Sequence, residues 1–159
     1  MSLRDNNWLQ AQLDHIWDTY FADVAQDNIV RIEFGRRAKY RLGSIKVDRR
    51  DAETSIITIN SLFKDIAIPE EIIQATIVHE LSHYSHGFNS PLPQKFSKPH
   101  AGGVMRQEFA ERGLESLYKM QRSWLKTNWP QIVQQNFPPR IVRRKSKPIA
   151  VPRPFWFLG

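Results

Sequence analysis

Two histidines and a glutamate stand at the spacing of a His-Glu-x-x-His motif, namely His79, Glu80 and His83. In a helix, positions i and i+4 lie about 40° apart around the axis and about 6 Å along it, so both imidazoles can bind one metal ion. Glu80 lies about 100° further round, where a carboxylate can accept a proton from a metal-bound water of pKa about 7. The motif predicts a catalytic zinc ion (Zn²⁺) with His79 and His83 as ligands and Glu80 as general base.

The flanking residues supply the helix that this motif needs. Five letters with two free positions also occur by chance on amphipathic helices, but here the helix has clear ends. Pro69 followed by Glu70 and Glu71 is typical of a helix start, and Gly87 of a helix end. The pattern predicts a helix over residues 69–86. Because apolar residues occupy both of its faces, we expect it in the middle of a domain, with a half-buried metal site.

A third ligand must come from elsewhere in the chain. The sequence contains no cysteine, which excludes disulfides, a thiolate nucleophile and a cysteine zinc ribbon. His100, beyond a loop, is the favoured candidate. His86 lies about 7–8 Å along the helix axis from the ion and reaches it only if the helix unwinds. Glu108 and Glu111 lie on the next predicted helix, like the third ligand of thermolysin-like peptidases. These three alternatives to His100 stay open.

The rest of the chain supplies the elements that position the motif. Apolar residues at helical spacing predict a helix over residues 6–25 and another bearing residues 105–118. Alternating segments predict strands over residues 30–34, 40–47 and 55–60, with short connections that favour a three-stranded antiparallel sheet. The expected fold class is α+β: an N-terminal helix, this sheet, the central motif helix and a following helix. Residues 88–103, rich in proline and glycine, form the loop before the last helix.

Several segments in this order resemble the SprT-like metallopeptidase domain, to which Spartan also belongs. They are Arg31-Ile-Glu-Phe-Gly-Arg-Arg-Ala, Ile57-Thr-Ile-Asn-Ser, Ile77-Val-His-Glu-Leu-Ser-His, then Pro99-His100 and a helix with Phe109, together spanning about residues 8–120. The resemblance implies a zincin-like fold, zinc ligands at His79, His83 and His100, and Glu80 as general base. It also implies cleavage of proteins crosslinked to DNA.

Charge is distributed unevenly along the chain. Residues 1–115 hold fourteen basic and sixteen acidic residues, a net charge of −2, whereas residues 116–159 hold nine basic residues and no acid. Aromatic residues such as Trp124 and Trp129 are interleaved with these basic residues, and Arg143, Arg144 and Lys145 form a run. This mixture suits phosphate neutralisation and base stacking, so single-stranded or damaged DNA is an expected partner. A solvated helix face with a tail docked on the domain explains the pattern equally well.

The expected organisation is a metallopeptidase domain over residues 1–120 and a basic, aromatic C-terminal segment over residues 121–159. The expected function is zinc-dependent hydrolysis of peptide bonds, in DNA repair, with a protein or peptide substrate. The alternatives are a DNA-binding module with a structural metal and a peptidase without a nucleic-acid role. No apolar run approaches membrane-spanning length and the N-terminus lacks a signal-peptide pattern, so we expect a cytoplasmic protein without membrane contact.

Overall fold

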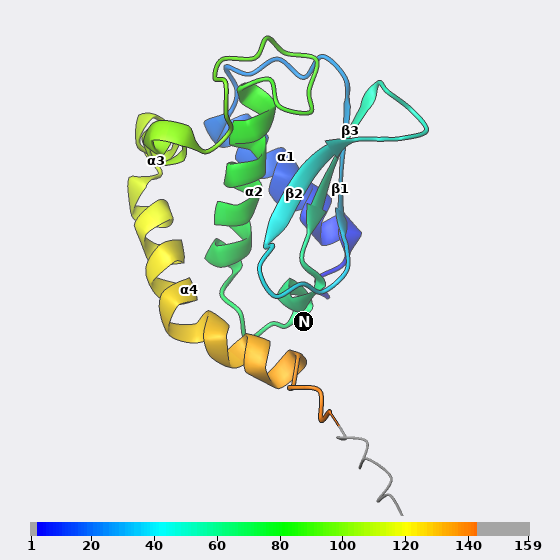
Figure 1. Cartoon of the computed structure of the whole chain (residues 1–159). Coiled ribbons are helices and arrows are strands. Elements are labelled where there is room, and N and C mark those ends of the chain that lie inside the picture. Colours follow the sequence, from blue (N-terminus) through cyan, green and yellow to red (C-terminus); the bar gives the residue numbers. More distant parts are fainter. Residues whose placement is uncertain (1–2, 143–159) are drawn as a thin grey trace, which may run out of the picture.

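The computed structural model describes residues 3–142, which form an α+β fold as predicted (Figure 1). The described strands are β1 (Ile29–Phe34), β2 (Gly43–Val47) and β3 (Thr54–Ile59), and the α-helices are α1 (Asn6–Tyr20), α2 (Glu70–Ser85), α3 (Val104–Glu111) and α4 (Glu115–Asn136). Two short 3₁₀ turns, Ser61–Lys64 and Ala101–Gly103, precede α2 and α3.

The sheet is mixed, so the antiparallel arrangement predicted from the short connections is wrong. Its strand order is β1-β3-β2, with β1 parallel to β3 and β2 antiparallel to β3. Among the connections between these three described strands, only the one between β2 and β3 is a hairpin. After β1 the chain passes the end of β3 and returns along its other edge as β2, which leaves β2 at the edge of the sheet.

The central place of β3 follows from its composition and from one asparagine. β3 is buried at five of its six positions, as expected of the most apolar strand. Directly after it, the Asn60 side chain donates hydrogen bonds to the carbonyl oxygens of Ala38 and Arg41, at 2.8 and 2.9 Å. The Asn60 backbone N–H donates to the Leu42 carbonyl at 2.8 Å. These bonds hold the β1–β2 connection, residues 35–42, around the end of β3.

Helix α2 lies between the sheet and α4 and contacts both (Figure 1). It begins after Pro69 and ends at Ser85, as the sequence predicts. Gly87 adopts a positive φ of 81°, and the Phe88 N–H donates to the His83 carbonyl at 3.0 Å, so the chain reverses beside the motif. Most of α2 is buried, including both of its apolar faces.

The helical region after the loop differs from the prediction of one helix over residues 105–118. Gly113, at a φ of 73°, separates α3 from α4, because a left-handed residue ends a helix. Helix α4 runs without a break through residues 120 and 121, where a domain boundary was expected. Gln121 is buried and donates to the Ile72 carbonyl and the Thr76 hydroxyl of α2, at 3.1 and 2.9 Å. Pro130 lies inside α4, which bends toward its C-terminal end (Figure 1).

The core of the fold is built from isoleucines of the sheet and α2, together with one face of α1. Leu9 and Leu13 of α1 are almost completely buried, and α1 packs on β1 and α2. None of the helices in residues 3–142 is long and apolar enough to cross a membrane.

Candidate metal centre

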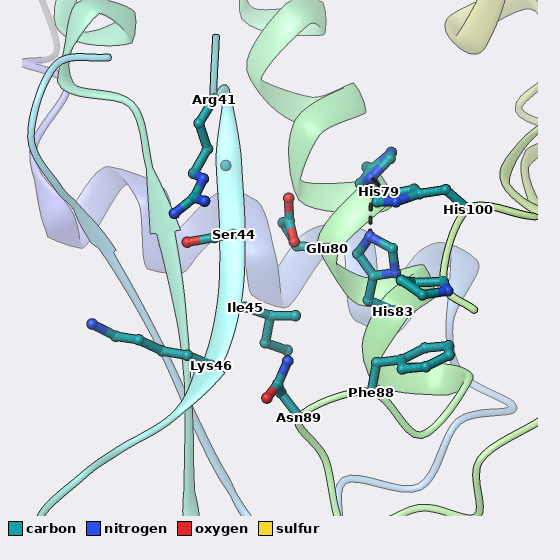
Figure 2. Close-up of a pocket in the computed structure, with 12 residues that line it drawn as sticks. Arg41, Ser44, Ile45, Lys46, His79, Glu80, His83, Phe88, Asn89 and His100 are labelled. Carbon is teal, nitrogen blue, oxygen red and sulfur yellow. Dashed lines mark hydrogen bonds between the residues drawn. The ribbon is translucent and has the colours of Figure 1, made fainter. Parts of the chain in front are cut away.

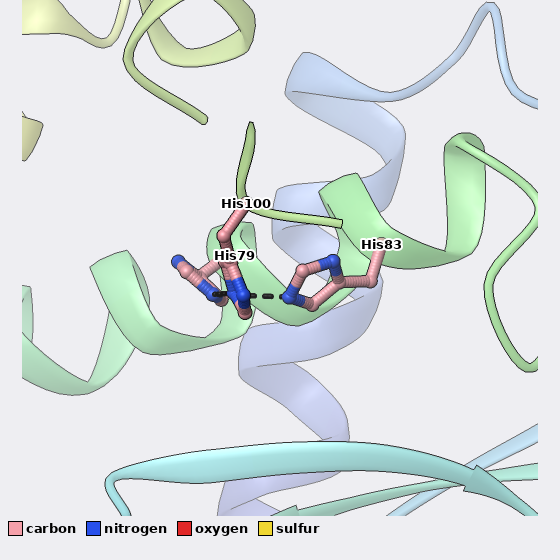
Figure 3. A group of neighbouring side chains, drawn as sticks. All are labelled: His79, His83 and His100. Atoms are coloured by element: carbon pink, nitrogen blue, oxygen red, sulfur yellow. Dashed lines mark hydrogen bonds between the residues drawn. The ribbon is translucent and has the colours of Figure 1, made fainter. Parts of the chain in front are cut away.

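Three histidine side chains converge beside α2 (Figure 3). His79 and His83 come from α2, one turn apart, and His100 comes from the end of the loop that precedes α3. The Nε2 atom of His79 lies 3.1 Å from Nε2 of His83 and 3.1 Å from Nε2 of His100. These nitrogens form a group that can hold a metal ion.

The spacing of the nitrogens fits a shared ion. Nitrogens bound at 2.0–2.1 Å to one tetrahedral ion lie roughly 3.3 Å apart, close to the separation found here. His79 faces two imidazoles with the same nitrogen, and this Nε2 carries either one proton or one lone pair, so it forms a single well-directed hydrogen bond with them. A cation accepts three lone pairs at once, whereas hydrogen bonds alone leave one contact unsatisfied. The residues present therefore fit a metal ion bound by three imidazoles.

The surroundings keep the α2 histidines neutral, which is the form that binds metals. Burial, with a smaller contribution from the nearby His100, lowers the pKa of His79 from 6.5 to about 4. Burial likewise lowers the pKa of His83 to about 3, with contributions from His79, His100 and His86. At neutral pH both imidazoles therefore present a free lone pair.

Glu80 lies beside the histidines, not among them, and its side chain extends from α2 toward β2 (Figure 2). The residue is only 4% exposed. Burial raises the pKa of its carboxyl group from 4.5 to about 8, while the positive charge of Arg41 acts in the opposite direction. A carboxyl group with a pKa near neutrality, next to a candidate metal site, suits a proton acceptor.

Gly43 allows β2 to approach the Glu80 side chain. A Cβ atom at this position would lie 2.8 Å from Cγ2 of Thr76 and 3.0 Å from Oε1 of Glu80. The contact with Thr76 is closer than Cβ atoms adopt and the contact with Glu80 is tight, so a larger residue would require these side chains or β2 to shift. Sequence reasoning placed Gly43 in a strand but did not connect it with the site.

Two of the three other groups considered as third ligands, His86 and Glu108, bind each other. Nε2 of His86 lies 2.8 Å from Oε2 of Glu108, and both side chains are largely buried. The other oxygen of Glu108 accepts a hydrogen bond from Arg112 at 2.8 Å, and Arg112 also pairs with Asp23 at 2.7 Å. The hydrogen bond from His86, followed by that from Arg112, lowers the pKa of Glu108 to about 2 against the opposing effect of burial.

The His86–Glu108 pair joins the end of α2 to α3, on either side of the loop that carries His100. The backbone carbonyl of His86 accepts a hydrogen bond from the backbone N–H of Lys95 in the loop, at 2.9 Å. The His86 ring packs against the Phe96 ring with a centroid separation of 4.8 Å. Glu111 is exposed and accepts a hydrogen bond from Gln107 at 2.8 Å. The three alternative third ligands therefore have other contacts. Of the four candidates, His100 is the one that reaches His79 and His83.

A groove of about 410 Å³ runs along the candidate metal centre. On one side lie four consecutive residues of β2, Gly43 to Lys46, and on the other lie the α2 motif, Phe88, Asn89 and Pro99 (Figure 2). β2 is an edge strand, and within residues 3–142 no other strand pairs with it on the side away from β3. The groove thus combines a backbone edge, a histidine cluster and a buried carboxyl group.

The residues predicted to contact nucleic acid lie away from this groove or outside the described part of the chain. Trp124 and Trp129 of α4 are partly buried against the core. The Trp129 indole donates a hydrogen bond to the Lys39 carbonyl at 2.8 Å. Arg143, Arg144 and Lys145 lie outside residues 3–142.

Arg41 is a site residue that sequence reasoning missed. It lines the groove and affects the Glu80 carboxyl through its charge. The sequence does contain a cluster of basic residues over 36–41 that could have indicated it. This cluster was hidden because charge was summed over the whole of residues 1–115.

Compared with models of protein families, with curated proteins and with solved structures, the chain gives no match. The resemblance to the SprT-like domain rests on the motif residues of this chain.

Proposed function

We propose that this protein is a zinc-dependent metallopeptidase of the SprT-like type, with Glu80 as its general base. The observation that carries the proposal is the convergence of three imidazole nitrogens beside a buried glutamate, in a groove edged by a β-strand. Three histidine ligands with a further coordination position left open are typical of catalytic zinc, whereas structural zinc sites usually have four protein ligands. A structural site also has no use for a carboxyl group such as that of Glu80.

In this proposal His79, His83 and His100 hold the ion. Bound zinc supplies Lewis-acid polarisation of a water molecule and of a substrate carbonyl. Glu80, in its carboxylate form, accepts the proton of the attacking water and delivers it to the departing amine nitrogen. A cation at the three histidines favours that carboxylate form, because an opposite charge nearby lowers the pKa of an acid.

The substrate in this proposal is an extended polypeptide. The free edge of β2 offers backbone donors and acceptors along the groove, and an extended chain can add to such an edge by backbone hydrogen bonds. Pairing of this kind is largely independent of side-chain identity. It would hold a peptide bond beside the histidines while leaving selectivity to other contacts.

The experiment compares zinc content with cleavage of an unfolded protein substrate. His83→Ala should lose most of the zinc, because one of the ligands is removed. Glu80→Gln should retain zinc and fold but hydrolyse about 10²–10⁴-fold more slowly, because it removes the base without changing the shape of the side chain. Zinc is measured by elemental analysis and cleavage by the appearance of new N-termini.

Glu111→Gln is the matched control, since Glu111 is an exposed acid outside the groove, and this variant should behave like wild type. Undiminished turnover in Glu80→Gln would contradict the proposed role of the glutamate. A wild-type protein without bound metal would contradict the proposal as a whole.

We further propose that the substrates are proteins associated with DNA. Between Ser116 and Val142 the chain holds Lys119, Arg122, Lys126 and Arg140 and no acidic residue, and five more basic residues follow. Such a segment neutralises phosphates, which would bring DNA-bound protein to the peptidase. The alternative, a peptidase without a nucleic-acid role, predicts no measurable affinity for DNA.

A further inference from the structure

A second cavity, of about 500 Å³, lies between the β1–β2 connection and α4. Its walls include Tyr40 and Leu42 from the connection and Leu125, Trp129 and Val133 from α4. The accessible lining is mostly apolar. An apolar hollow at the surface marks a place where an apolar group can be removed from water.

This apolar cavity is connected to the groove of the candidate metal centre. A third cavity, of about 340 Å³, shares Tyr40 and Leu42 with the apolar cavity, and it shares Gly43 and Glu80 with the metal groove. The three cavities follow one another along the edge strand β2 and the connection before it. A single extended chain can therefore occupy both the groove and the apolar cavity.

The walls of the apolar cavity are fixed by contacts within the fold. The Trp129 indole N–H donates to the Lys39 carbonyl at 2.8 Å, and its ring packs against Phe63 with a centroid separation of 5.7 Å. Asn60 holds the connection from the other side. Tyr40, by contrast, is 93% exposed. A largely preformed cavity binds its ligand without the entropic cost of ordering a loop.

Basic residues lie on the rim of the cavity, at Lys39 and Lys126, and along the segment that leads to the metal groove. Between Phe34 and Asp48 the chain holds five basic residues and no acidic residue, namely Arg36, Arg37, Lys39, Arg41 and Lys46. Lys126 of α4 adds a further positive charge at the cavity itself. Arg37 and Lys39 also lie over the Phe137 ring, at 5.3 and 5.5 Å, which draws these side chains toward α4. The rim therefore favours a ligand that carries carboxylates beside an apolar group.

We propose that the apolar cavity is an exosite for the polypeptide substrate. It binds a large apolar side chain of the substrate that is flanked by aspartate or glutamate. This inference rests on the proposed peptidase function and adds a substrate preference to it. Polypeptide fits better than nucleic acid because the edges of a base carry polar groups, which an apolar cavity would leave unpaired. The Trp129 ring is also held as a wall, not presented as a free stacking surface.

The geometry of β2 sets how far the anchoring side chain lies from the cleaved bond. Leu42 precedes Ile45, which lines the metal groove, by three residues. A strand rises about 3.3 Å per residue, so a chain paired with β2 needs about three to five residues to reach the apolar cavity from the metal centre. A tetrapeptide substrate that spans the cleaved bond is too short to use the exosite.

The test measures binding without relying on cleavage. A fluorescently labelled twelve-residue peptide, with one leucine among aspartates, is titrated into zinc-loaded Glu80→Gln protein. Tyr40→Ala, which alters an exposed wall, and Val133→Glu, which places a charge in the cavity, are introduced in the same background. Each should weaken binding, Val133→Glu by roughly ten- to a hundredfold, the range expected for losing the burial of one leucine side chain.

The controls separate the cavity from general charge. Replacing the peptide's leucine by serine should weaken binding as strongly as Val133→Glu does. Arg50→Glu, an exposed charge reversal on the β2–β3 hairpin, should weaken it far less than Lys126→Glu. Equal binding by Val133→Glu, Tyr40→Ala and the Arg50→Glu control would overturn the exosite. A twelve-nucleotide oligothymidylate provides the second outcome that would overturn it. If this oligonucleotide displaces the peptide and itself fails to bind the cavity variants, the cavity is a nucleic-acid site.

Kinetics with the active protein distinguish failure of the exosite from failure of the proposed function. Tyr40→Ala and Lys126→Glu should raise KM for the long acidic peptide several-fold and leave kcat, and the cleavage of a tetrapeptide, unchanged. Peptide binding without any cleavage by wild type would overturn the peptidase and with it this substrate role. Cleavage with the same KM in wild type and both variants would overturn the exosite alone. Zinc content and circular dichroism confirm that each variant folds.

Discussion

The buried Glu80 carboxyl group favours its protonated form in the metal-free protein, whereas the proposed role as general base requires its ionised form. Without a cation, burial raises its pKa to about 8, so the group is protonated at neutral pH. A general base must instead be ionised. An ion held by His79, His83 and His100 would supply the charge that stabilises the carboxylate. The arrangement thus links the protonation of Glu80 to metal binding.

This coupling predicts a pH-dependent effect of Glu80→Gln on the metal-free protein. Because the folded pKa lies above the unfolded one, the contribution of Glu80 to the free energy of unfolding is fully present below about pH 4.5 and is lost as the pH rises through about 8. Glutamine has no such loss. Relative to wild type, the variant should gain on the order of a few kcal/mol between these pH values, with the difference levelling off above them.

Denaturant unfolding of chelator-treated wild type and Glu80→Gln, from pH 5 to 9, measures this difference. His79 and His83 titrate in both proteins, so their effect cancels in the comparison. The Glu111→Gln control should show a small difference that does not change with pH. A flat difference for Glu80→Gln as well would mean that the carboxyl group is hydrated and the raised pKa is wrong.

The two α2 ligands and the third ligand belong to different elements, and the contacts of α3 set their relative positions. Helix α2 carries His79 and His83, whereas His100 lies between the loop and α3. The His86–Glu108 pair joins α2 to α3 at 2.8 Å, and Arg112 extends it to Asp23 after α1. Rigid support of this kind matters because a ligand displaced by a fraction of an ångström binds a metal less well.

Zinc affinities of three variants test this arrangement. His100→Ala should weaken zinc binding most, because it removes a ligand. His86→Ala and Glu108→Gln should weaken it less, by roughly tenfold, because they only loosen the support of the loop. Competition with a chromophoric chelator measures all three. A larger loss in His86→Ala than in His100→Ala would place the third ligand on α2.

Acidic and basic residues are distributed unevenly along the whole chain. The acidic residues all lie at or before Glu115, and the nine basic residues after it extend from α4 into residues 143–159. The described part adds a second basic group on the β1–β2 connection, which contacts the C-terminal end of α4. Within residues 3–142, basic residues of the β1–β2 connection therefore lie beside the C-terminal end of α4, although Lys39 and Trp129 are 90 positions apart in the sequence.

If the C-terminal segment binds single-stranded DNA, affinity should fall by about 0.7 log units per phosphate contact for each tenfold rise in salt. Replacing Arg143, Arg144 and Lys145 by alanine should reduce that slope by up to about 2 and lower DNA-stimulated cleavage, with zinc content unchanged. Fluorescence anisotropy of a labelled oligonucleotide at several salt concentrations measures the slope. No affinity at low salt would leave the peptidase without a role for DNA.

The amino-acid sequence by itself determined those features that depend on neighbouring residues. The helix over 70–85, its ends and the convergence of His79 with His83 follow from helical periodicity and end signals, and the α+β class follows from the order of apolar patterns. Each of these depends on residues within one or two turns or one strand. Because such interactions involve only neighbouring residues, the sequence is enough to predict them, and the structure contains these elements.

Only the tertiary structure decided how distant segments meet. The pairing of β1 with β3, the contact of His86 with Glu108, and the approach of Trp129 to Lys39 join residues between 22 and 90 positions apart. Alternation of apolar residues shows which face of a strand is buried but not which strand lies beside it. Strand order here depends on β3 taking the buried centre and on Asn60 holding the connection around its end, and these contacts exist only once the chain has folded.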